Sequence, residues 1–405
     1  MKRIANLTIL LVVVMISAVN AFSQDWSQFR GPGRDSKVTG FKAPAKWPAE
    51  LTLKWKITVG TGDATPVLAG KNIFLHTRQG AEETVLCLDA ATGKQIWRYS
   101  YAAPAVTGPA SSHPGPRSTP VIGEGKIVTF GVSGITSCLD LTSGKLLWKK
   151  DENQGVPQFS TGMSPIIYKG SVILQTGGKD NGQVVAYDLN TGAEKWKYTS
   201  EGPAYASPSM MTIDKILQVV LFTEKSLISL DPSNGKFLWK IETPPMQRFY
   251  VSVSPYIDGN KIYYTGLGAG SKAVEISRQG DTYVSKELWS NPEVGAKWTT
   301  PILKDGYLYG FTDQRRIYCI NAANGQTAWI DNATNSDFYT ILDCGSVIIG
   351  FPSTGYLIVF KPDPKAYSEI VKYKVAETAV YAFPVITGNN IYVKDAESLM
   401  LYSIN

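Results

Sequence analysis

A short pattern recurs five times along the chain and constrains the fold more than any other feature. Each copy starts at Asp or Asn, passes through Thr-Gly, Ser-Gly or Asn-Gly, and ends at a Trp eight residues after its start. Repetition at a fixed internal spacing is the signature of a repeat architecture, in which one long domain can use the whole chain. The copies run from Asp89 to Trp97, Asp140 to Trp148, Asp188 to Trp196, Asp231 to Trp239 and Asn321 to Trp329.

The physical chemistry of the pattern is that of a β-hairpin. An apolar strand ends at the Asp, whose carboxylate can accept the free N–H groups of a turn. The following Gly supplies the positive φ that lets a second strand return. The Trp then lies on that strand, where its ring can fill the gap between neighbouring sheets. We therefore interpret the repeated Asp and Trp residues as structural.

A second marker precedes each repeat: Ser or Thr followed by Pro opens an apolar strand. Proline is tolerated at the first residue of an edge strand, and the innermost strand of a propeller blade is such an edge. The marker occurs at Thr65-Pro66, Thr119-Pro120, Ser164-Pro165, Ser207-Pro208, Ser254-Pro255 and Thr300-Pro301, with Phe383-Pro384 as a variant.

Together the markers predict an all-β, eight-bladed propeller of four-stranded antiparallel blades. Blade five has a longer hairpin before Trp289, and blade seven carries Tyr373 in place of Trp. The last blade stops after three strands, while residues 53–57 around Trp55 form a strand with no blade before it. Pairing this strand with the C-terminal blade would close the ring and remove an exposed edge. A seven-bladed ring is the alternative.

The first residues have the features of a secretory signal peptide. A basic start at Lys2 and Arg3 precedes an apolar run, and small residues stand before a cleavage site near Ser23/Gln24. A membrane anchor is the alternative. No Cys lies near that site to carry a lipid. We expect a signal peptide at 1–23, an N-terminal extension at 24–52 and the propeller at 53–405, in a protein that is secreted or periplasmic.

The four cysteines and two histidines give little chemistry. Cys87, Cys138 and Cys319 each precede the Asp or Asn of a repeat by two residues, at a small buried position that Ala186 and Ser229 fill in other blades. Equivalent positions in different blades are too far apart for a disulfide. Neither the Cys nor the His spacing predicts a metal site, and we identify no Ser-His-Asp arrangement.

A binding site is expected where the links between blades open around the channel. The residues just before each Ser/Thr-Pro converge there, and they combine aromatic walls with a few cations. Such a set suits a flat anionic ligand or a peptide segment, or else the rings only cap the channel. The candidate pocket residues are Asp63, Arg117, Tyr205, Tyr250, Lys297, Trp298, Tyr339 and Tyr381. Acidic groups are too sparse here for a calcium site.

The repeat resembles that of the pyrroloquinoline-quinone-like propellers from about Leu53 to Asn405. One branch of that family comprises quinoprotein dehydrogenases, which hold the quinone and calcium on the channel axis. Another branch is non-catalytic and similar to the BamB scaffolds of outer-membrane protein assembly. The chain lacks an adjacent Cys pair, and no position matches the catalytic Asp or the calcium ligands of the enzymes. Arg117 and Trp298 match the quinone-binding Arg and the stacking ring by residue type only.

The segment from Asp25 to Arg34 looks like the opening of many secreted propellers of this family. It contains Trp26 and Phe29 among small and basic residues. We expect both rings to dock on the propeller and to hold Arg30 and Arg34 at its rim.

The function that this sequence favours is a monomeric, non-catalytic scaffold that binds a protein partner in the cell envelope, without a cofactor. The formal charge of +6 falls to +4 without Lys2 and Arg3, and no basic stripe indicates nucleic acid. The alternative is a quinoprotein alcohol or sugar dehydrogenase that uses pyrroloquinoline quinone and calcium in the channel. A sugar-hydrolysing propeller is less favoured because paired carboxylates are missing.

Overall fold

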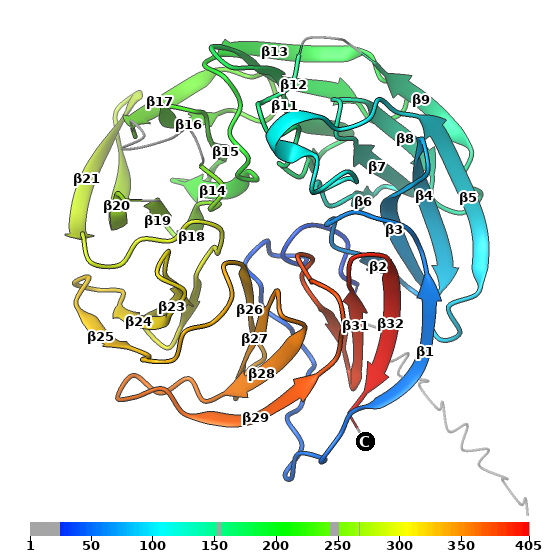
Figure 1. The fold of residues 1–405 in the computed structure, drawn as a ribbon. Helices are drawn as coiled ribbons and strands as arrows, with labels where there is room; N and C mark the ends of the chain where they lie inside the picture. Colours follow the sequence, from blue (N-terminus) through cyan, green and yellow to red (C-terminus); the bar gives the residue numbers. More distant parts are fainter. Residues whose placement is uncertain (1–24, 152–154, 244–250, 267, 405) are drawn as a thin grey trace, which may run out of the picture.

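The protein is an eight-bladed β-propeller in a computed structural model that describes residues 25–151, 155–243, 251–266 and 268–404 (Figure 1). These residues form eight four-stranded antiparallel sheets around a central channel. The predicted signal peptide lies outside the described residues. Within them, no helix is long and apolar enough to cross a membrane.

The first four blades follow one another along the chain, each beginning with a short innermost strand. Blade one comprises β2 (Val67–Ala69), β3 (Asn72–Gln79), β4 (Glu82–Asp89) and β5 (Gln95–Ala102). A 3-10 helix, η1 (Gly108–Ala110), lies in the link to blade two, which comprises β6 (Val121–Gly123), β7 (Lys126–Phe130), β8 (Thr136–Asp140) and β9 (Leu146–Lys150). Blade three comprises β10 (Ile166–Tyr168), β11 (Ser171–Gly178), β12 (Asn181–Asp188) and β13 (Glu194–Ser200). Blade four comprises β14 (Ser209–Ile213), β15 (Ile216–Phe222), β16 (Ser226–Leu230) and β17 (Phe237–Glu242).

The later blades keep this order, and the last one borrows a strand. Blade five comprises β18 (Tyr256–Asp258), β19 (Lys261–Gly266), β20 (Gly270–Gln279) and β21 (Thr282–Asn291). Blade six comprises β22 (Ile302–Lys304), β23 (Tyr307–Phe311), β24 (Ile317–Asn321) and β25 (Thr327–Ile330). Blade seven comprises β26 (Tyr339–Asp343), β27 (Ile348–Pro352), β28 (Tyr356–Phe360) and β29 (Glu369–Lys374). Blade eight comprises β30 (Val385–Thr387), β31 (Asn390–Lys394), β32 (Ser398–Ser403) and β1 (Thr52–Thr58).

The N-terminal strand closes the ring as predicted. β1 pairs antiparallel with β32, from Thr52 opposite Ser403 to Thr58 opposite Ser398, with a bulge between Leu53 and Trp55. Trp55 takes the place of the repeat Trp in this blade, because a Cβ on Gly93 of blade one would lie 3.0 Å from its ring. The ladder leaves no blade short of its outer strand, which confirms the count of eight.

The repeated Trp joins each blade to the next. Trp148 of blade two donates its indole N–H to the Leu189 carbonyl of blade three at 3.0 Å, and Trp97, Trp196, Trp289 and Trp329 make the equivalent bond to their own neighbours. Trp239 is an exception, since it donates to Gln218 of its own blade. Each buried indole therefore adds a directional contact to the apolar area that it covers.

The predicted small position on the third strand faces this Trp. Cys87 pairs with Trp97 across the ladder, and the same register holds in the other blades. A bulky residue here would press on the ring that must lie flat between the sheets. Cys87, Cys138, Cys319 and Cys344 are all buried free thiols.

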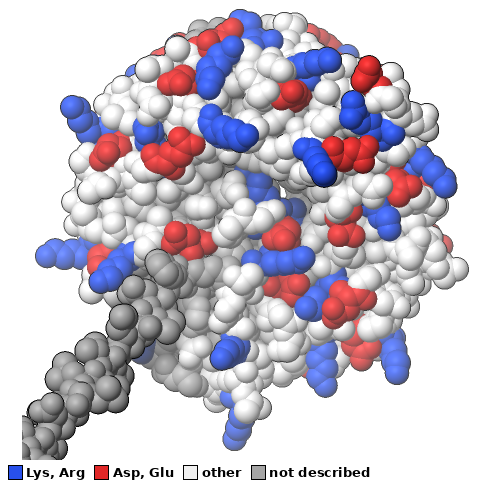
Figure 2. Space-filling model, turned by 180° about the vertical axis from the view of Figure 1, so that it is seen from behind, with Lys and Arg blue, Asp and Glu red and all other residues white. Residues whose placement is uncertain are grey.

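Apolar cores lie between blades rather than inside them, because each blade is a single sheet. One cluster joins blades two and three through Val128, Leu174 and Val185. The largest cluster spans blades seven, eight and one, and it also includes Trp26, Val38 and Phe41 from the N-terminal extension. On the outer surface, basic and acidic side chains are interspersed across the face opposite to that of Figure 1 (Figure 2).

Candidate functional site: a cup on the channel axis

Two tiers of residues, set by the Ser/Thr-Pro marker, surround the channel on the face seen in Figure 1. The upper tier is the residue two positions before each marker Ser or Thr, or its counterpart in blades seven and eight. All eight of its members line one cavity: Asp63, Arg117, Gly162, Tyr205, Ser252, Trp298, Phe338 and Tyr381. Because the marker repeats while these residues differ, the tier breaks the eightfold symmetry of the ring.

The lower tier is the marker residue itself, and it forms a chain of hydrogen bonds between blades. The backbone N–H of each member donates to the hydroxyl of the member in the next blade. These bonds start at Phe383, which donates to Thr65, and pass through Thr119, Ser164, Ser207 and Ser254 to Thr300, at 2.9–3.3 Å. The marker thus places a hydroxyl around the axis in six of the eight blades, which the sequence alone did not reveal.

The N-terminal extension fills the channel below the tiers. We call residues 25–38 the strap. At one end Trp26 pairs with Leu68 of β2 and is only 1% exposed, and at the other end Val38 donates to the Asp343 carbonyl of β26. In Figure 1 the dark blue trace of this segment runs near the centre of the ring.

Two arginines of the strap are buried on the channel axis, not held at the rim as expected. Arg34 donates to the carbonyls of Ser164, Pro165 and Pro208 at 2.8–3.2 Å. Arg30 donates to the Pro301 carbonyl at 3.0 Å, and its Nη1 has no partner. The reason is that innermost strands turn an unpaired edge to the channel, and the carbonyls of that edge need donors.

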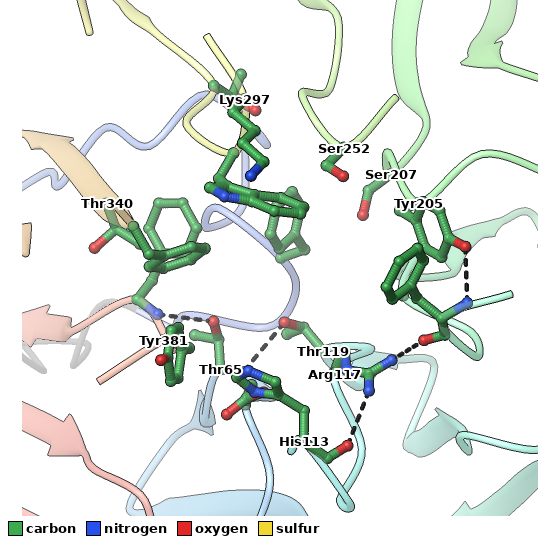
Figure 3. A pocket seen from close by; sticks show the side chains of 18 of the residues that line it. Thr65, His113, Arg117, Thr119, Tyr205, Ser207, Ser252, Lys297, Thr340 and Tyr381 are labelled. Carbon is green, nitrogen blue, oxygen red and sulfur yellow. Dashed lines mark hydrogen bonds and ion pairs between the residues drawn. The ribbon is translucent and has the colours of Figure 1, made fainter. Parts of the chain in front are cut away.

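Above the strap the channel widens into a cup, a cavity of about 430 Å³ with Phe29 of the strap among its lining residues (Figure 3). The guanidinium carbon of Arg34 lies 5.8 Å from the centroid of the Phe29 ring. The strap occupies the channel below, and the cup faces the side of the links between blades.

A hydrogen-bonded pair of Asp63 and His113 forms one wall of the cup. His113 Nδ1 lies 2.6 Å from Asp63 Oδ2, and its ring meets Tyr381 edge-on at 4.7 Å. Arg117 holds this link in place by donating to the carbonyls of Ala110, His113 and Phe159. Burial lowers the pKa of Arg117, with the nearby Asp63 carboxylate opposing that effect.

The adjoining wall is aromatic and carries a cation. The ammonium of Lys297 lies 4.9 Å from the ring centroid of Trp298, and Phe338 packs edge-on against Tyr381 at 5.3 Å. Figure 3 shows Lys297 at the edge of the cavity and Tyr205 across the cavity from Tyr381. A guest with an aromatic or apolar body can therefore contact rings on more than one side.

A family model described as outer membrane protein assembly factor BamB matches residues 45–179 and 81–331, more than half of the chain. The chain belongs to the BamB-like propeller family. Most of the site lies in the matched range, whereas the strap precedes it.

Two kinds of relative share this repeat. BamB of Burkholderia pseudomallei is 23% identical over 352 residues, which cover 84% of each chain. The quinohemoprotein alcohol dehydrogenase ADH IIB of Pseudomonas putida is 26% identical over 272 residues, which cover 64% of this chain but only 37% of that enzyme. The crystal structure of BamB from Moraxella catarrhalis superposes with a TM-score of 0.66 at 15% identity, covering 87% of this chain and 100% of that one. The quinohemoprotein alcohol dehydrogenase of Comamonas testosteroni also gives 0.66 at 15% identity, covering 95% of this chain and 81% of the other, so these likenesses show the fold alone.

The donor set of the cup does not fit the calcium ion expected under the dehydrogenase alternative. Calcium takes six to eight oxygen ligands, several of them carboxylates. The cup offers two carboxylates: Asp63, bonded to His113, and Asp337, paired with Arg315. Within the described ranges no three His, Cys, Asp or Glu residues are grouped as a metal site.

The structure brings together most of the predicted pocket residues. Seven of the eight line the cup: Asp63, Arg117, Tyr205, Lys297, Trp298, Tyr339 and Tyr381. Tyr250 lies outside the described residues. Tyr339 contributes little accessible chemistry, because it stacks on Phe311 at 4.6 Å and burial raises the pKa of its hydroxyl well above the ordinary value. The sequence reasoning missed His113 and Phe29 as lining residues, since neither stands at a repeat position.

Proposed function

We propose that this protein is a binding scaffold of the cell envelope and that a segment of a partner protein docks in the cup. The single observation that carries the proposal is the upper tier. Eight equivalent positions converge on one cavity and carry seven different residue types, among them the charged Asp63 and Arg117 and the aromatic Trp298 and Tyr381. Recognition sites are concave, mostly apolar and supplied with a few convergent polar groups.

The BamB relatives support an assembly role, since that is the function their name states. We propose that the chain acts in the periplasm or outside the cell, after cleavage near Ser23/Gln24, as a monomer without a cofactor. The propeller contributes rigidity, because a preformed site loses little conformational entropy when a partner binds.

The experiment uses the chain from residue 24 as bait for cross-linked capture from an envelope extract. Trp298→Ala removes the largest ring of the cup, and we expect about tenfold less of the specific partner, as for the loss of an aromatic anchor. The matched control is Phe237→Ala, which removes an exposed ring from the outer strand β17. Equal capture by the wild type and both variants would contradict docking in the cup.

A quinoprotein dehydrogenase is the second candidate, favoured by the enzyme relatives and by the half-buried indole of Trp298 in the cup. Adding pyrroloquinoline quinone and calcium to the same protein tests it. A stoichiometric chromophore with reduction of a dye by alcohols or sugars would replace the scaffold proposal. We expect neither, because the cup lacks the carboxylates that calcium needs.

A further inference from the structure

Two buried cations of the strap lie beneath the cup, and Arg34 has no carboxylate near it, whereas the effect of burial on the pKa of Arg30 is opposed by Asp35, which raises it. Arg30 and Arg34 are 1% and 6% exposed, and neither contacts a carboxylate of the described residues. Asp35, which follows Arg34 in the strap, lies 3.8 Å from Lys37. Burial lowers the pKa of Arg30 to about 10 and that of Arg34 to about 9, so both remain charged at neutral pH.

The carbonyls around these guanidinium groups satisfy hydrogen bonds but do not neutralise charge. In a site of low dielectric, an uncompensated cation raises the affinity of its surroundings for an anion. Arg34 donates to the carbonyl of Ser164, a member of the lower tier, so the charge lies one residue below the hydroxyls that surround the cup.

The lower tier supplies the second, independent observation. Each of its six hydroxyl oxygens accepts a backbone N–H, from Thr65 round to Thr300. A hydroxyl has one proton to donate besides the bonds that it accepts, and that proton is left for a guest on the axis. Thr65, Thr119, Ser207 and Thr300 line the cup directly, and Figure 3 shows the hydroxyls of Thr119 and Ser207 facing the cavity.

The walls of the cup add to this polarity. Both carboxylates that line it already have cationic or imidazole partners, whereas Lys297 at the rim touches only the Trp298 ring among the contacts of the described residues. A guest thus meets rings on its sides, an ammonium at the entrance and O–H donors above buried guanidinium groups at the floor.

We propose that the cup takes an apolar or aromatic group that ends in an oxyanion, a carboxylate or phosphate, with the oxyanion against the lower-tier hydroxyls. This rests on the proposed function, because it assigns the chemistry of the segment that the cup recognises. The oxyanion has two sources, a small organic acid or an acidic side chain or C-terminus of the partner protein.

The test compares a carboxylate with its neutral isostere. We would titrate 4-phenylbutyrate, 4-phenylbutyramide and inorganic phosphate into the protein by calorimetry at low ionic strength. The carboxylate should bind about tenfold more tightly than the amide, as expected for hydrogen bonds to a charged group. The preference should shrink as salt is added.

Two variants and a control locate the preference. Arg34→Gln should weaken binding of the carboxylate and leave that of the amide unchanged, a ratio that a merely structural role would not move. Lys297→Met, at the rim, should also reduce the ratio of carboxylate to amide affinity. This variant keeps the test decisive if Arg34→Gln does not fold. Lys236→Met is the control, since it removes a lysine from the turn between β16 and β17.

Equal affinity for carboxylate and amide, or a preference that survives both variants, would overturn the inference. A competition experiment distinguishes the two sources of the oxyanion. 4-Phenylbutyrate should displace the captured partner if the partner supplies the oxyanion. If 4-phenylbutyrate binds without displacing the partner, a small acid is the natural guest. Trp298-dependent capture without any carboxylate preference would leave the scaffold proposal standing and remove this one. A carboxylate preference without Trp298-dependent capture would remove the scaffold proposal and leave the carboxylate preference of the cup standing.

Discussion

At the scale of single residues, the repeat glycine has two roles that one substitution can separate. Gly144 has a positive φ of 70°, and a Cβ at this position would lie 2.5 Å from the Trp97 ring of the preceding blade. Gly125 in the same blade has a φ of 72°, and nothing lies within 4 Å of its would-be Cβ. Backbone strain alone costs about 1–2 kcal/mol. Gly144→Ala should therefore destabilise the protein by about 1–3 kcal/mol more than Gly125→Ala, because it also displaces the indole.

The check is the free energy of unfolding from chemical denaturation of both variants. Equal losses of stability in the two variants would mean that only the turn conformation requires Gly at position 144, and that the Trp97 ring adapts without cost.

A second prediction at this scale concerns His76, which is buried beside Glu83 and Tyr101. Burial lowers its pKa below the ordinary 6.5, against the opposing influence of Glu83. Near and below that pH the unfolded chain takes up a proton that the folded protein does not, so the free energy of unfolding falls as the pH falls. His76→Gln should flatten this dependence between about pH 7.5 and about pH 5.5, as followed by urea denaturation. A slope unchanged by His76→Gln would refute the assignment.

At the scale of elements, the ring closure is a single ladder between the two ends of the chain. Thr58 of β1 and Ser398 of β32 are cross-strand partners, close enough for a disulfide. Thr58→Cys with Ser398→Cys should stabilise the oxidised protein by about 2–4 kcal/mol, since the bridge constrains a very long loop of the unfolded chain. The same variant with reductant is the control, and identical unfolding midpoints with and without reductant would contradict the prediction.

The parts of this molecule that the sequence predicted are the elements that carry a local sequence signal. The blades were predictable because each repeat is a local hairpin signal, and even the borrowed strand could be placed through Trp55. Five of the eight upper-tier residues were among the predicted pocket residues for the same reason, since residues such as Asp63 and Arg117 stand at a fixed offset from the marker. His113 and the strap were not, because their contacts are long-range and their local sequence has no periodicity. Phe29 reaches the cup only because the channel has room for a segment that no repeat describes.

At the scale of the whole molecule, the strap turns an open ring into a ring with a filled centre. Arg34 binds carbonyls of blades three and four, and Arg30 binds one of blade six. A segment that contacts distant blades at once opposes their separation. The backbone of the strap is nevertheless strained, because Arg30, Arg34 and Ser36 all adopt positive φ. Such strain persists only where the surrounding structure holds it. The strap therefore depends on its anchors as much as the ring depends on the strap.

Trp26 is the anchor on which this dependence can be measured. Trp26→Ala should lower the free energy of unfolding by about 3–5 kcal/mol, the usual cost of removing a buried Trp. Trypsin cannot reach Arg30 or Arg34 while the strap is seated, because both are buried, so cleavage after them should appear in Trp26→Ala before any cut within the blades. Trp47→Ala is the matched control, since this half-buried ring packs outside the channel against Tyr373. If Trp26→Ala stayed resistant while Trp47→Ala was cut, the strap would be held by its arginines and not by the indole. Cleavage of the strap should also weaken binding in the cup, because the charge beneath Phe29 leaves with it.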